Sequence, residues 1–583
     1  MQRYSSAREG VERLSEKLKQ SVDEINSLKE KAGYWEARYN TAKEEVGRLN
    51  SIINKLDDLE RESTSAIAYY RERMDEAIRK LKETIEKYRA LLGNERVSFE
   101  SSTVKILEDL KITQEKLQKV LPYFPLILNL YWKPTRVVND KIYDINVAFE
   151  VISPLSSLEV VEVTLRPIEY KYFITKYGMR EEDYNKIFPE EDVRIVRIKP
   201  LQTGRMIFSV DFKDFKGGRE YFIEVRVRDT TGNEGRAEIK TPYIRQFENI
   251  AKTDDITVVV PYYLWYRRDL SNWRDGHKYM PLLGEYRSDD PIVMSKHIDW
   301  ATGHGVDVFA VSWTGYEYGD LKYFDDNLKL LFNNPLSKDI KIMILYESPG
   351  RLKTTGNPSA PWEKNLSDEE NIKTLISDFI YFSREYFNRE NYFKLNGRPV
   401  VYIYDSSAFI GNVSGAIQKL REAVREKGYE VFLISDHVHP YVLPGSNPDW
   451  EERARQFDGI TSWLGGYSGE GIYLGGSYEA QLGILYSQWG EWARLNNKKL
   501  VPSITPEFDN RQVSWGNPNS IPIERSPQLF IQRLRIALNY TERARIIMIG
   551  TWNDFFESTT LEPTITYGFT YLTLLNEVLA SYS

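Results

Sequence analysis

Two carboxylate side chains three residues apart, Asp554 and Glu557, are the residues of this sequence best placed to do chemistry. They follow an apolar run at 546–551 that is typical of a buried strand. If a helical turn begins after that run, both side chains point the same way. Two carboxyl groups that flank one bond can supply the acid and the base for glycoside cleavage. Acidic residues also cap the first turn of a helix, so the spacing alone leaves both interpretations open.

Eight short apolar runs predict the strands that would position this pair, and helical patterns lie between them. Together they predict a parallel (β/α)8 TIM barrel. An open doubly wound sheet is the alternative, but no glycine-rich phosphate loop follows the first run. The runs are 256–261, 306–313, 340–346, 399–404, 431–435, 459–463, 500–504 and 546–551.

The residues that follow these runs indicate a sugar substrate. Nearly every predicted strand ends in an aromatic ring or a carboxylate, which can stack on sugar faces, bind hydroxyls or exchange protons. A phosphate-processing barrel would have glycine-rich anion loops there. Beside the catalytic candidates Asp554 and Glu557, the predicted substrate-binding residues are Tyr262, Tyr263, Trp265, Glu285, Trp313, Tyr346, Glu347, His437, Asn510, Arg511 and Asn553.

Each of these residues also has a purely structural interpretation. The aromatic side chains could form the barrel core, and the two glutamates could make surface salt bridges. His437 could cap a loop, and Arg511 could hold Asp509 in an ion pair. The functional role expected of Asn553 is to orient Asp554.

A separate helical domain is expected at the N-terminus, over residues 1–121. Apolar residues from Val11 to Leu56, and again from Ile67 to Leu91, recur at alternating steps of three and four. This heptad seam predicts a coiled coil and a homo-oligomer formed through residues 11–91. A helical hairpin that folds back on its own chain is the alternative, and Trp35 suits a wider bundle than a dimer.

Residues 122–247 predict an all-β domain, which leaves 248–583 for the barrel. Apolar and polar residues alternate as in half-buried strands. The last two segments flank the turn 229–233 and resemble the final hairpin of an immunoglobulin-like or fibronectin-like sandwich. We interpret this domain as a spacer, with a carbohydrate-binding module or a packing partner for the barrel as alternatives. The segments are 141–151, 158–166, 193–199, 206–212, 221–228 and 236–241.

Composition narrows the function classes. A net charge of -7 argues against a general nucleic-acid binder. The absence of cysteine excludes thiolate chemistry, and the five histidines form no zinc-protease motif, so we expect neither metal nor cofactor. No apolar run is long enough to span a membrane, and the first residues lack a signal-peptide core. As written, the chain would be cytoplasmic; it would be secreted or at the cell surface if a signal or anchor were removed. Abundant Glu, Lys, Ile and Tyr are typical of a heat-adapted protein.

Several short segments, taken together and in order, resemble glycoside hydrolase family 99, the endo-α-mannosidases and endo-α-mannanases, and the related WbsX-like proteins of polysaccharide gene clusters. The resemblance covers about residues 250–583. It implies a metal-independent, endo-acting α-glycosidase whose substrate is an oligosaccharide or polysaccharide. The segments are 261–266, 281–286, 288–289, 312–313, 396–400, 505–511 and 551–563.

The resemblance also implies roles for the two acids. In that family two glutamates lie in an Asn-Glu-x-x-Glu stretch. The first deprotonates the sugar 2-hydroxyl, which attacks to give an epoxide-like anhydrosugar, and the second is the general acid and then the base for water. These roles fall on Asp554 and Glu557. Position 554 is Asp, however, and Asn-Asp-x-x-Glu resembles the inverting α-1,3-glucanases of family 71.

The shorter side chain at 554 leaves two questions open. Withdrawing a carboxylate by one methylene widens the gap between the acids, which could admit a water and favour inversion. The outcome could thus be retaining or inverting, on an α-mannoside or an α-glucan. Two other functions stay as alternatives: a non-catalytic oligomeric scaffold that binds glycans, and a transglycosylase of polysaccharide assembly.

Overall fold

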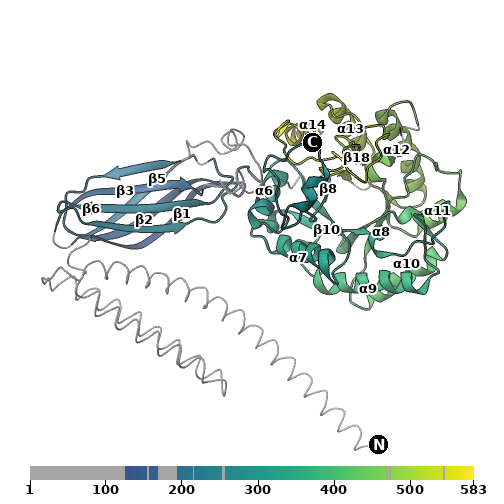
Figure 1. Ribbon diagram of the computed structural model, residues 1–583, viewed down its shortest axis with the longest axis horizontal. Helices are drawn as coiled ribbons and strands as arrows, with labels where there is room; N and C mark the ends of the chain where they lie inside the picture. Colours follow the sequence, from purple (N-terminus) through teal and green to yellow (C-terminus); the bar gives the residue numbers. More distant parts are fainter. Residues whose placement is uncertain are drawn as a thin grey trace, which may run out of the picture.

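The structure is a computed structural model that describes residues 125–582, except 154–155, 169–192, 215, 252–255, 468–470, 472–473 and 542–544. The predicted coiled coil at 1–121 lies outside the described residues. Within them, the chain forms a pair of antiparallel sheets followed by a barrel (Figure 1). None of the helices in these described ranges is both long and apolar enough to cross a membrane.

The antiparallel part consists of two sheets that share one core. Their strand orders are β1-β2-β5 and β4-β3-β6-β7. Val147 of β2 and Val163 of β3 belong to the same buried cluster, so the sheets pack face to face as a sandwich. The strands are β1 (Leu126–Val138), β2 (Lys141–Ser153), β3 (Leu158–Pro167), β4 (Arg194–Ile198), β5 (Gly204–Phe212), β6 (Tyr221–Asp229) and β7 (Glu234–Lys240).

Six of these strands coincide with the segments expected from alternation, and β1 was missed. Most of β1 is exposed or half-buried, so its sequence carries no regular apolar face. Its pairing with β2 also shifts register at three places, which interrupts any period of two. An immunoglobulin-like topology stays a prediction.

The second part is a parallel sheet that closes on itself. Its hydrogen-bonded order is β17-β16-β15-β13-β10-β9-β8-β19-β18. The end strands β17 and β18 are pieces of one extended stretch, separated by Val501 and Pro502. Val501 donates to Ile460 on one side, and Pro502 accepts from Met548 on the other. Counted once, this stretch leaves eight strands in a ring, which fits the predicted TIM barrel.

All eight runs expected from the sequence are strands, with ends shifted by a few residues. They are β8 (Thr257–Tyr262), β9 (Val308–Trp313), β10 (Lys341–Glu347), β13 (Arg398–Tyr404), β15 (Phe432–Ser435), β16 (Gly459–Ile460), β17 (Lys499–Leu500) with β18 (Ser503–Ile504), and β19 (Ile546–Ile549). The remaining short strands are β11 (Lys364–Asn365), β12 (Lys394–Leu395) and β14 (Phe409–Ile410).

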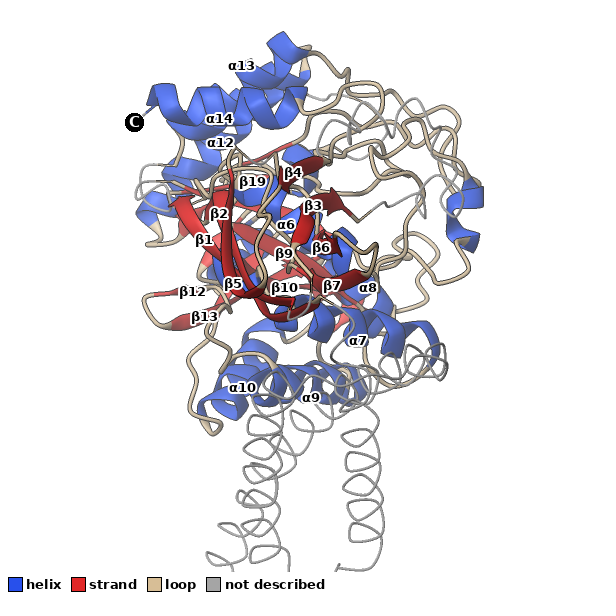
Figure 2. Cartoon of the chain, turned by 90° about the vertical axis from the view of Figure 1, so that its left-hand side faces the viewer, coloured by secondary structure: helices blue, strands red, loops and turns tan. Residues whose placement is uncertain are grey.

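One helix follows each barrel strand, and Figure 2 shows helices arranged around the strands. Side chains cap their first turns: Asp290 accepts from Ile292 at the start of α6, and Ser477 from Ala480 at the start of α12. The helices are α6 (Pro291–Thr302), α7 (Gly319–Asn333), α9 (Glu369–Glu385), α10 (Val413–Arg425), α11 (Pro448–Arg455), α12 (Tyr478–Leu495), α13 (Pro527–Asn539) and α14 (Thr570–Tyr582), with short turns at α8 (Ser348–Arg351), η3 (Ser271–Asp275), η4 (Ser337–Asp339), η5 (Ser406–Ala408) and η6 (Trp463–Gly466).

Buried polar contacts join the sandwich to the barrel. Arg245, which follows β7, donates to Asp339 at 2.9 Å and lies 3.7 Å from Asp299 of α6. Asp299 also accepts from the Tyr243 hydroxyl at 3.0 Å and from the Gln246 N–H at 2.6 Å. The two parts therefore meet through charges that are shielded from water.

Candidate active site

The loop that leaves β19 places both predicted acids at the C-terminal face of the barrel. The Asp554 carboxylate accepts the N–H groups of Phe556 at 3.1 Å and Glu557 at 3.0 Å, and its own N–H donates to Thr551 at 2.9 Å. Asp554 therefore does cap the turn, as its alternative interpretation anticipates. The same turn brings Glu557 close enough for the charge of Asp554 to act on it.

The two acids hold their protons with different strength. Burial raises the pKa of Asp554 to about 6, although the two backbone N–H groups oppose the rise. Burial raises the pKa of Glu557 well above its ordinary value, and the charges of Asp554 and Glu347 raise it further. Within the described residues, the Glu557 carboxyl accepts no hydrogen bond that would stabilise its anion. Asp554 therefore ionises first and Glu557 keeps the proton.

Glu347 supplies a third carboxyl group beside this pair. It ends β10, pairs in register with Tyr404 of β13, and accepts the Ser312 hydroxyl at 2.8 Å. Burial raises the pKa of Glu347 to about 7, with the charges of Asp554 and Asp405 adding to the rise.

Aromatic rings lie next to the three carboxyl groups. Tyr263 stacks on Trp265 with ring centroids 3.9 Å apart, and its pKa is raised by burial and by the charges of all three acids. The pKa of Tyr404 is raised by burial and by the charges of two of these acids. Trp463 packs edge-on against the Tyr404 ring, with ring centroids 5.1 Å apart. Tyr404 and Trp463 were not among the predicted binding residues, although their places at strand ends are a signal that could have identified them.

A family model for glycosyl hydrolase family 99 matches residues 266–576, just over half of the chain. The chain belongs to glycosyl hydrolase family 99. It is 23% identical over 304 residues to the glycoprotein endo-alpha-1,2-mannosidase of Xenopus laevis, covering 50% of this chain and 59% of that relative. It is 21% identical over 301 residues to the glycoprotein endo-alpha-1,2-mannosidase-like protein of Homo sapiens, and the match covers 50% of this chain and 58% of that relative.

The chain thus spans less than 60% of the length of these family 99 relatives. Among solved structures, the GH99 endo-alpha-mannosidase of Bacteroides thetaiotaomicron in complex with Bis-Tris propane is 19% identical. The match covers 57% of this chain and 98% of the chain in that structure, with a TM-score of 0.43.

Three predicted binding residues of this family 99 barrel lie away from the acids. Tyr262, Trp313 and Tyr346 are buried, and each bonds to a side chain of an outer helix, at 2.9, 3.0 and 2.9 Å. The helices are α6, α7 and α9, respectively. The side chains therefore face the helical layer, in agreement with their alternative interpretation as core.

The charges of the two acids do not shift the pKa of two further predicted residues, Glu285 and His437. Glu285 is half-buried, and burial raises its pKa while Arg274 opposes the rise. His437 is fully buried against Trp450, and burial together with the charge of Arg453 lowers its pKa to about 3. His437 is therefore a neutral packing residue at ordinary pH.

The two residues predicted after the seventh strand have different surroundings. Arg511 is exposed, and its guanidinium forms two bonds of 2.8 Å with Asp509. This ion pair is the alternative that the sequence left open. Asn510 is half-buried in the same loop, and its side-chain oxygen has no hydrogen-bond partner among the described residues.

Asn553 holds two strand exits together. Its amide accepts the Tyr263 N–H at 2.8 Å and donates to the Tyr263 carbonyl at 2.9 Å and to the Tyr286 hydroxyl at 3.1 Å. Behind it, Tyr286 donates to Glu562 at 2.7 Å, and Glu562 lies 3.2 Å from His297. Asn553 therefore fixes the loop after β8 against the loop after β19, and its side chain does not bond to Asp554.

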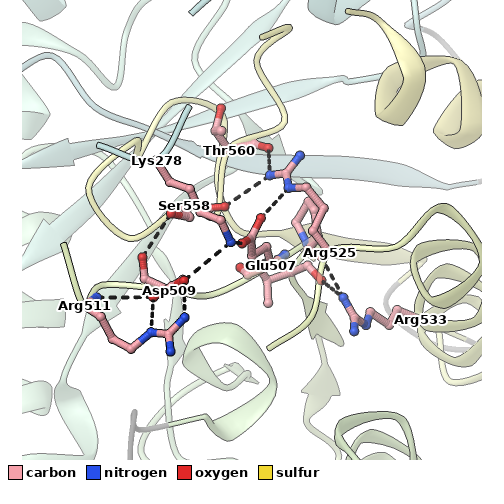
Figure 3. Close-up of polar contacts among 10 residues, drawn as sticks. Lys278, Glu507, Asp509, Arg511, Arg525, Arg533, Ser558 and Thr560 are labelled. Atoms are coloured by element: carbon pink, nitrogen blue, oxygen red, sulfur yellow. Dashed lines mark hydrogen bonds and ion pairs between the residues drawn. The ribbon is translucent and has the colours of Figure 1, made fainter. Parts of the chain in front are cut away.

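A charged clamp fixes the loop that carries Glu557 (Figure 3). Arg525 donates to Glu507 at 2.7 Å and to the carbonyls of Ser558 at 3.1 Å and Thr560 at 2.6 Å. Arg525 and Glu507 are both buried, with side chains 3% and 1% exposed, so their mutual attraction is little screened by water.

Asp509 completes this clamp next to the acid. Its N–H donates to the Glu557 carbonyl at 2.8 Å, and its carbonyl accepts the Ser558 hydroxyl at 3.0 Å. Lys278 bridges Glu507 and Asp509. The clamp was not predicted from the sequence: Glu507 and Asp509 stand in the segment 505–511, but nothing around Arg525 marks it as their partner.

Proposed function

We propose that this chain is an endo-acting glycoside hydrolase that cleaves α-mannosidic or α-glucosidic linkages. Glu557 is the general acid and Asp554 its partner base. The observation that carries this proposal is the turn after β19, which places two carboxyl groups three residues apart at the mouth of a barrel and caps itself on the first of them, Asp554. Membership of family 99 and the names of its relatives support the substrate class.

In the first step, Glu557 gives its proton to the glycosidic oxygen as the bond to the anomeric carbon breaks. Ionised Asp554 takes up a proton at the same time. If that proton comes from the 2-hydroxyl, the freed oxygen attacks the anomeric carbon and forms an anhydrosugar. Water, deprotonated by Glu557, then opens this ring while Asp554 returns its proton, and the anomeric configuration is retained.

If the proton comes from water instead, the hydroxide attacks the anomeric carbon directly and the configuration inverts. The anomer formed at early times, followed by NMR, distinguishes the two routes. In both routes Glu347 binds a sugar hydroxyl, and the rings of Trp265 and Trp463 stack on sugar faces.

The deciding experiment replaces Glu557 with Gln and measures hydrolysis of α-mannan and α-glucan oligosaccharides. The amide cannot donate a proton to the leaving oxygen, so we expect turnover to fall about 100- to 10,000-fold. The melting temperature should stay close to that of the parent because the Glu557 carboxyl has no hydrogen-bond partner to lose among the described residues.

Glu220→Gln is the matched control, since it neutralises a half-buried glutamate that directly precedes β6 of the sandwich, outside the barrel. It should keep most of the activity. Unchanged turnover in the Glu557 variant would refute the assignment. Binding of glycans by the parent without any product would favour a scaffold instead.

A further inference from the structure

Two tryptophan side chains, Trp362 and Trp515, stand in the solvent. They are 58% and 56% exposed, whereas every other tryptophan of the described residues is buried or half-buried. A single exposed ring on a protein surface needs no explanation. The positions of these two rings in the barrel, however, call for an explanation.

Both rings lie in loops at the C-terminal face, on opposite sides of the barrel mouth. Trp362 lies between β10 and α9, and Trp515 lies between β18 and α13. Strands β13, β15 and β16 separate β10 from the β17–β18 stretch in one direction, and β9, β8 and β19 separate them in the other. A line from one ring to the other therefore crosses the mouth where the acids lie.

Trp362 is tied to the carboxyl cluster on its own side. The buried Lys364 donates to the Trp362 carbonyl at 2.8 Å and pairs with Asp405 at the end of β13. Asp405 is one of the charges that raise the pKa of Glu347. The loop that carries Trp362 is also held by the pairing of β11 with β14. The exposed ring is thus carried on an anchored backbone beside the site.

Trp515 is tied to the acid on the other side. Ser514 donates its N–H to Asp275 at 3.0 Å, and hydrogen bonds from Ser514 and Trp515 lower the pKa of the Asp275 carboxyl. The same loop contains Asp509, whose N–H bonds to the carbonyl of Glu557. Both ends of the line are therefore preorganised, which reduces the entropy lost when a ligand binds.

We infer that Trp362 and Trp515 are sugar-binding platforms at the two ends of a saccharide chain that lies across the barrel mouth. The inference rests on the proposed function and specifies its substrate: a chain of hexoses that continues on both sides of the cleaved bond. A flat indole covers the apolar face of a sugar ring, and its indole N–H can bond to a hydroxyl.

The test measures binding of α-mannan and α-glucan oligosaccharides of increasing length to the Glu557→Gln chain, with and without Trp362→Ala or Trp515→Ala. Each tryptophan variant should bind long chains about threefold to tenfold more weakly, the loss of one stacking contact. Binding of the shortest oligosaccharides, which reach neither ring, should not change. In the active chain the same variants should raise KM for long chains and leave kcat on a short aryl glycoside unchanged.

Two exposed tyrosines provide controls. Tyr441 follows β15 and lies off the proposed line, and Tyr582 ends α14. Alanine at either position should leave binding of long chains unchanged. The inference is overturned if the tryptophan variants bind long chains as the unsubstituted tryptophans do, or if the Glu557→Gln chain binds no saccharide of any length. Retained turnover in Glu557→Gln would refute the proposed acid, while the length dependence of binding would still test the two platforms.

Discussion

At the scale of single residues, the chemistry depends on which of two similar carboxyl groups keeps its proton. Asp554 receives two backbone N–H groups and Glu557 receives none from the part of the chain that the structure describes, because the cap of the turn uses the earlier residue and leaves the later one outside it. The capping interpretation and the catalytic interpretation of Asp554 are therefore compatible. The cap itself makes the two acids unequal in pKa, because its N–H groups stabilise the anion of Asp554 only.

This inequality predicts a bell-shaped dependence of kcat/KM on pH. As the pH falls through about 6, Asp554 takes up a proton and no longer acts as a base, so the rate should fall. On the alkaline side, Glu557 loses the proton that it must donate. Because its pKa is raised well above the ordinary range of a glutamate, this second limb should lie at higher pH than the first.

Initial rates on an α-mannan or α-glucan oligosaccharide, measured across this range at constant ionic strength, give both limbs as properties of the pair. Parallel measurements of thermal stability exclude unfolding as the cause of either limb. A rate that is highest below pH 4 would contradict the prediction.

At the scale of elements, the barrel strands were predictable and the contacts between their exit loops were not. Runs such as 306–313 are apolar because both faces of a parallel strand are buried, and that signal is local. The clamp pairs Arg525 with Glu507 and with carbonyls at Ser558 and Thr560, across a chain separation that no periodicity records.

The same limit applies to side-chain direction at the strand ends. Ser312 faces Glu347, whereas its neighbour Trp313 faces Asp325 of a helix. One residue of register reverses the face. The sequence places both residues at the end of the second strand but does not say which of them turns inward. Trp313 and Tyr346 were therefore expected at the site, but their side chains face the helical layer.

The clamp makes a prediction for Arg525→Met. It removes the main cation from buried Glu507 and two donors from the loop behind Glu557, so we expect a loss of about 3 kcal/mol in the free energy of unfolding. Lys278 still pairs with Glu507, which keeps the loss near the lower end of the range for a broken buried pair. The freed loop should also lower kcat more than it changes KM.

Chemical denaturation and steady-state kinetics check the two parts of this prediction. Lys278→Met is the matched control: its side chain is 34% exposed, against 3% for Arg525, so its loss should cost less. Equal stability and equal kcat in Arg525→Met and the parent would show that the clamp does not position the acid.

At the scale of the whole molecule, the barrel depends on the segment between β7 and β8 for a buried charge. The side chain of Asp299 is 0% exposed and that of Arg245 is 2% exposed. Burial raises the pKa of Asp299, and Arg245 opposes the rise. Arg245→Met should therefore lower the free energy of unfolding by about 3–5 kcal/mol near neutral pH.

The cost should shrink as the pH falls, because Asp299 without its cation can take up a proton and lose its charge. Denaturation curves at neutral and acidic pH measure the difference. Arg228→Met, which breaks a surface pair in which both partners are 47% exposed, should cost less than about 1 kcal/mol at either pH. A loss that does not depend on pH would contradict the role assigned to Asp299.

The Arg245 side chain also limits how this protein could be divided. The match to family 99 begins at residue 266, after the first barrel strand has already ended at Tyr262. A fragment that begins at residue 256 would contain every strand of the ring. It would lack Arg245, however, and would leave the buried Asp299 carboxylate of α6 without this cation. A fragment that keeps Asp299 paired therefore begins upstream of Tyr243 and includes Arg245.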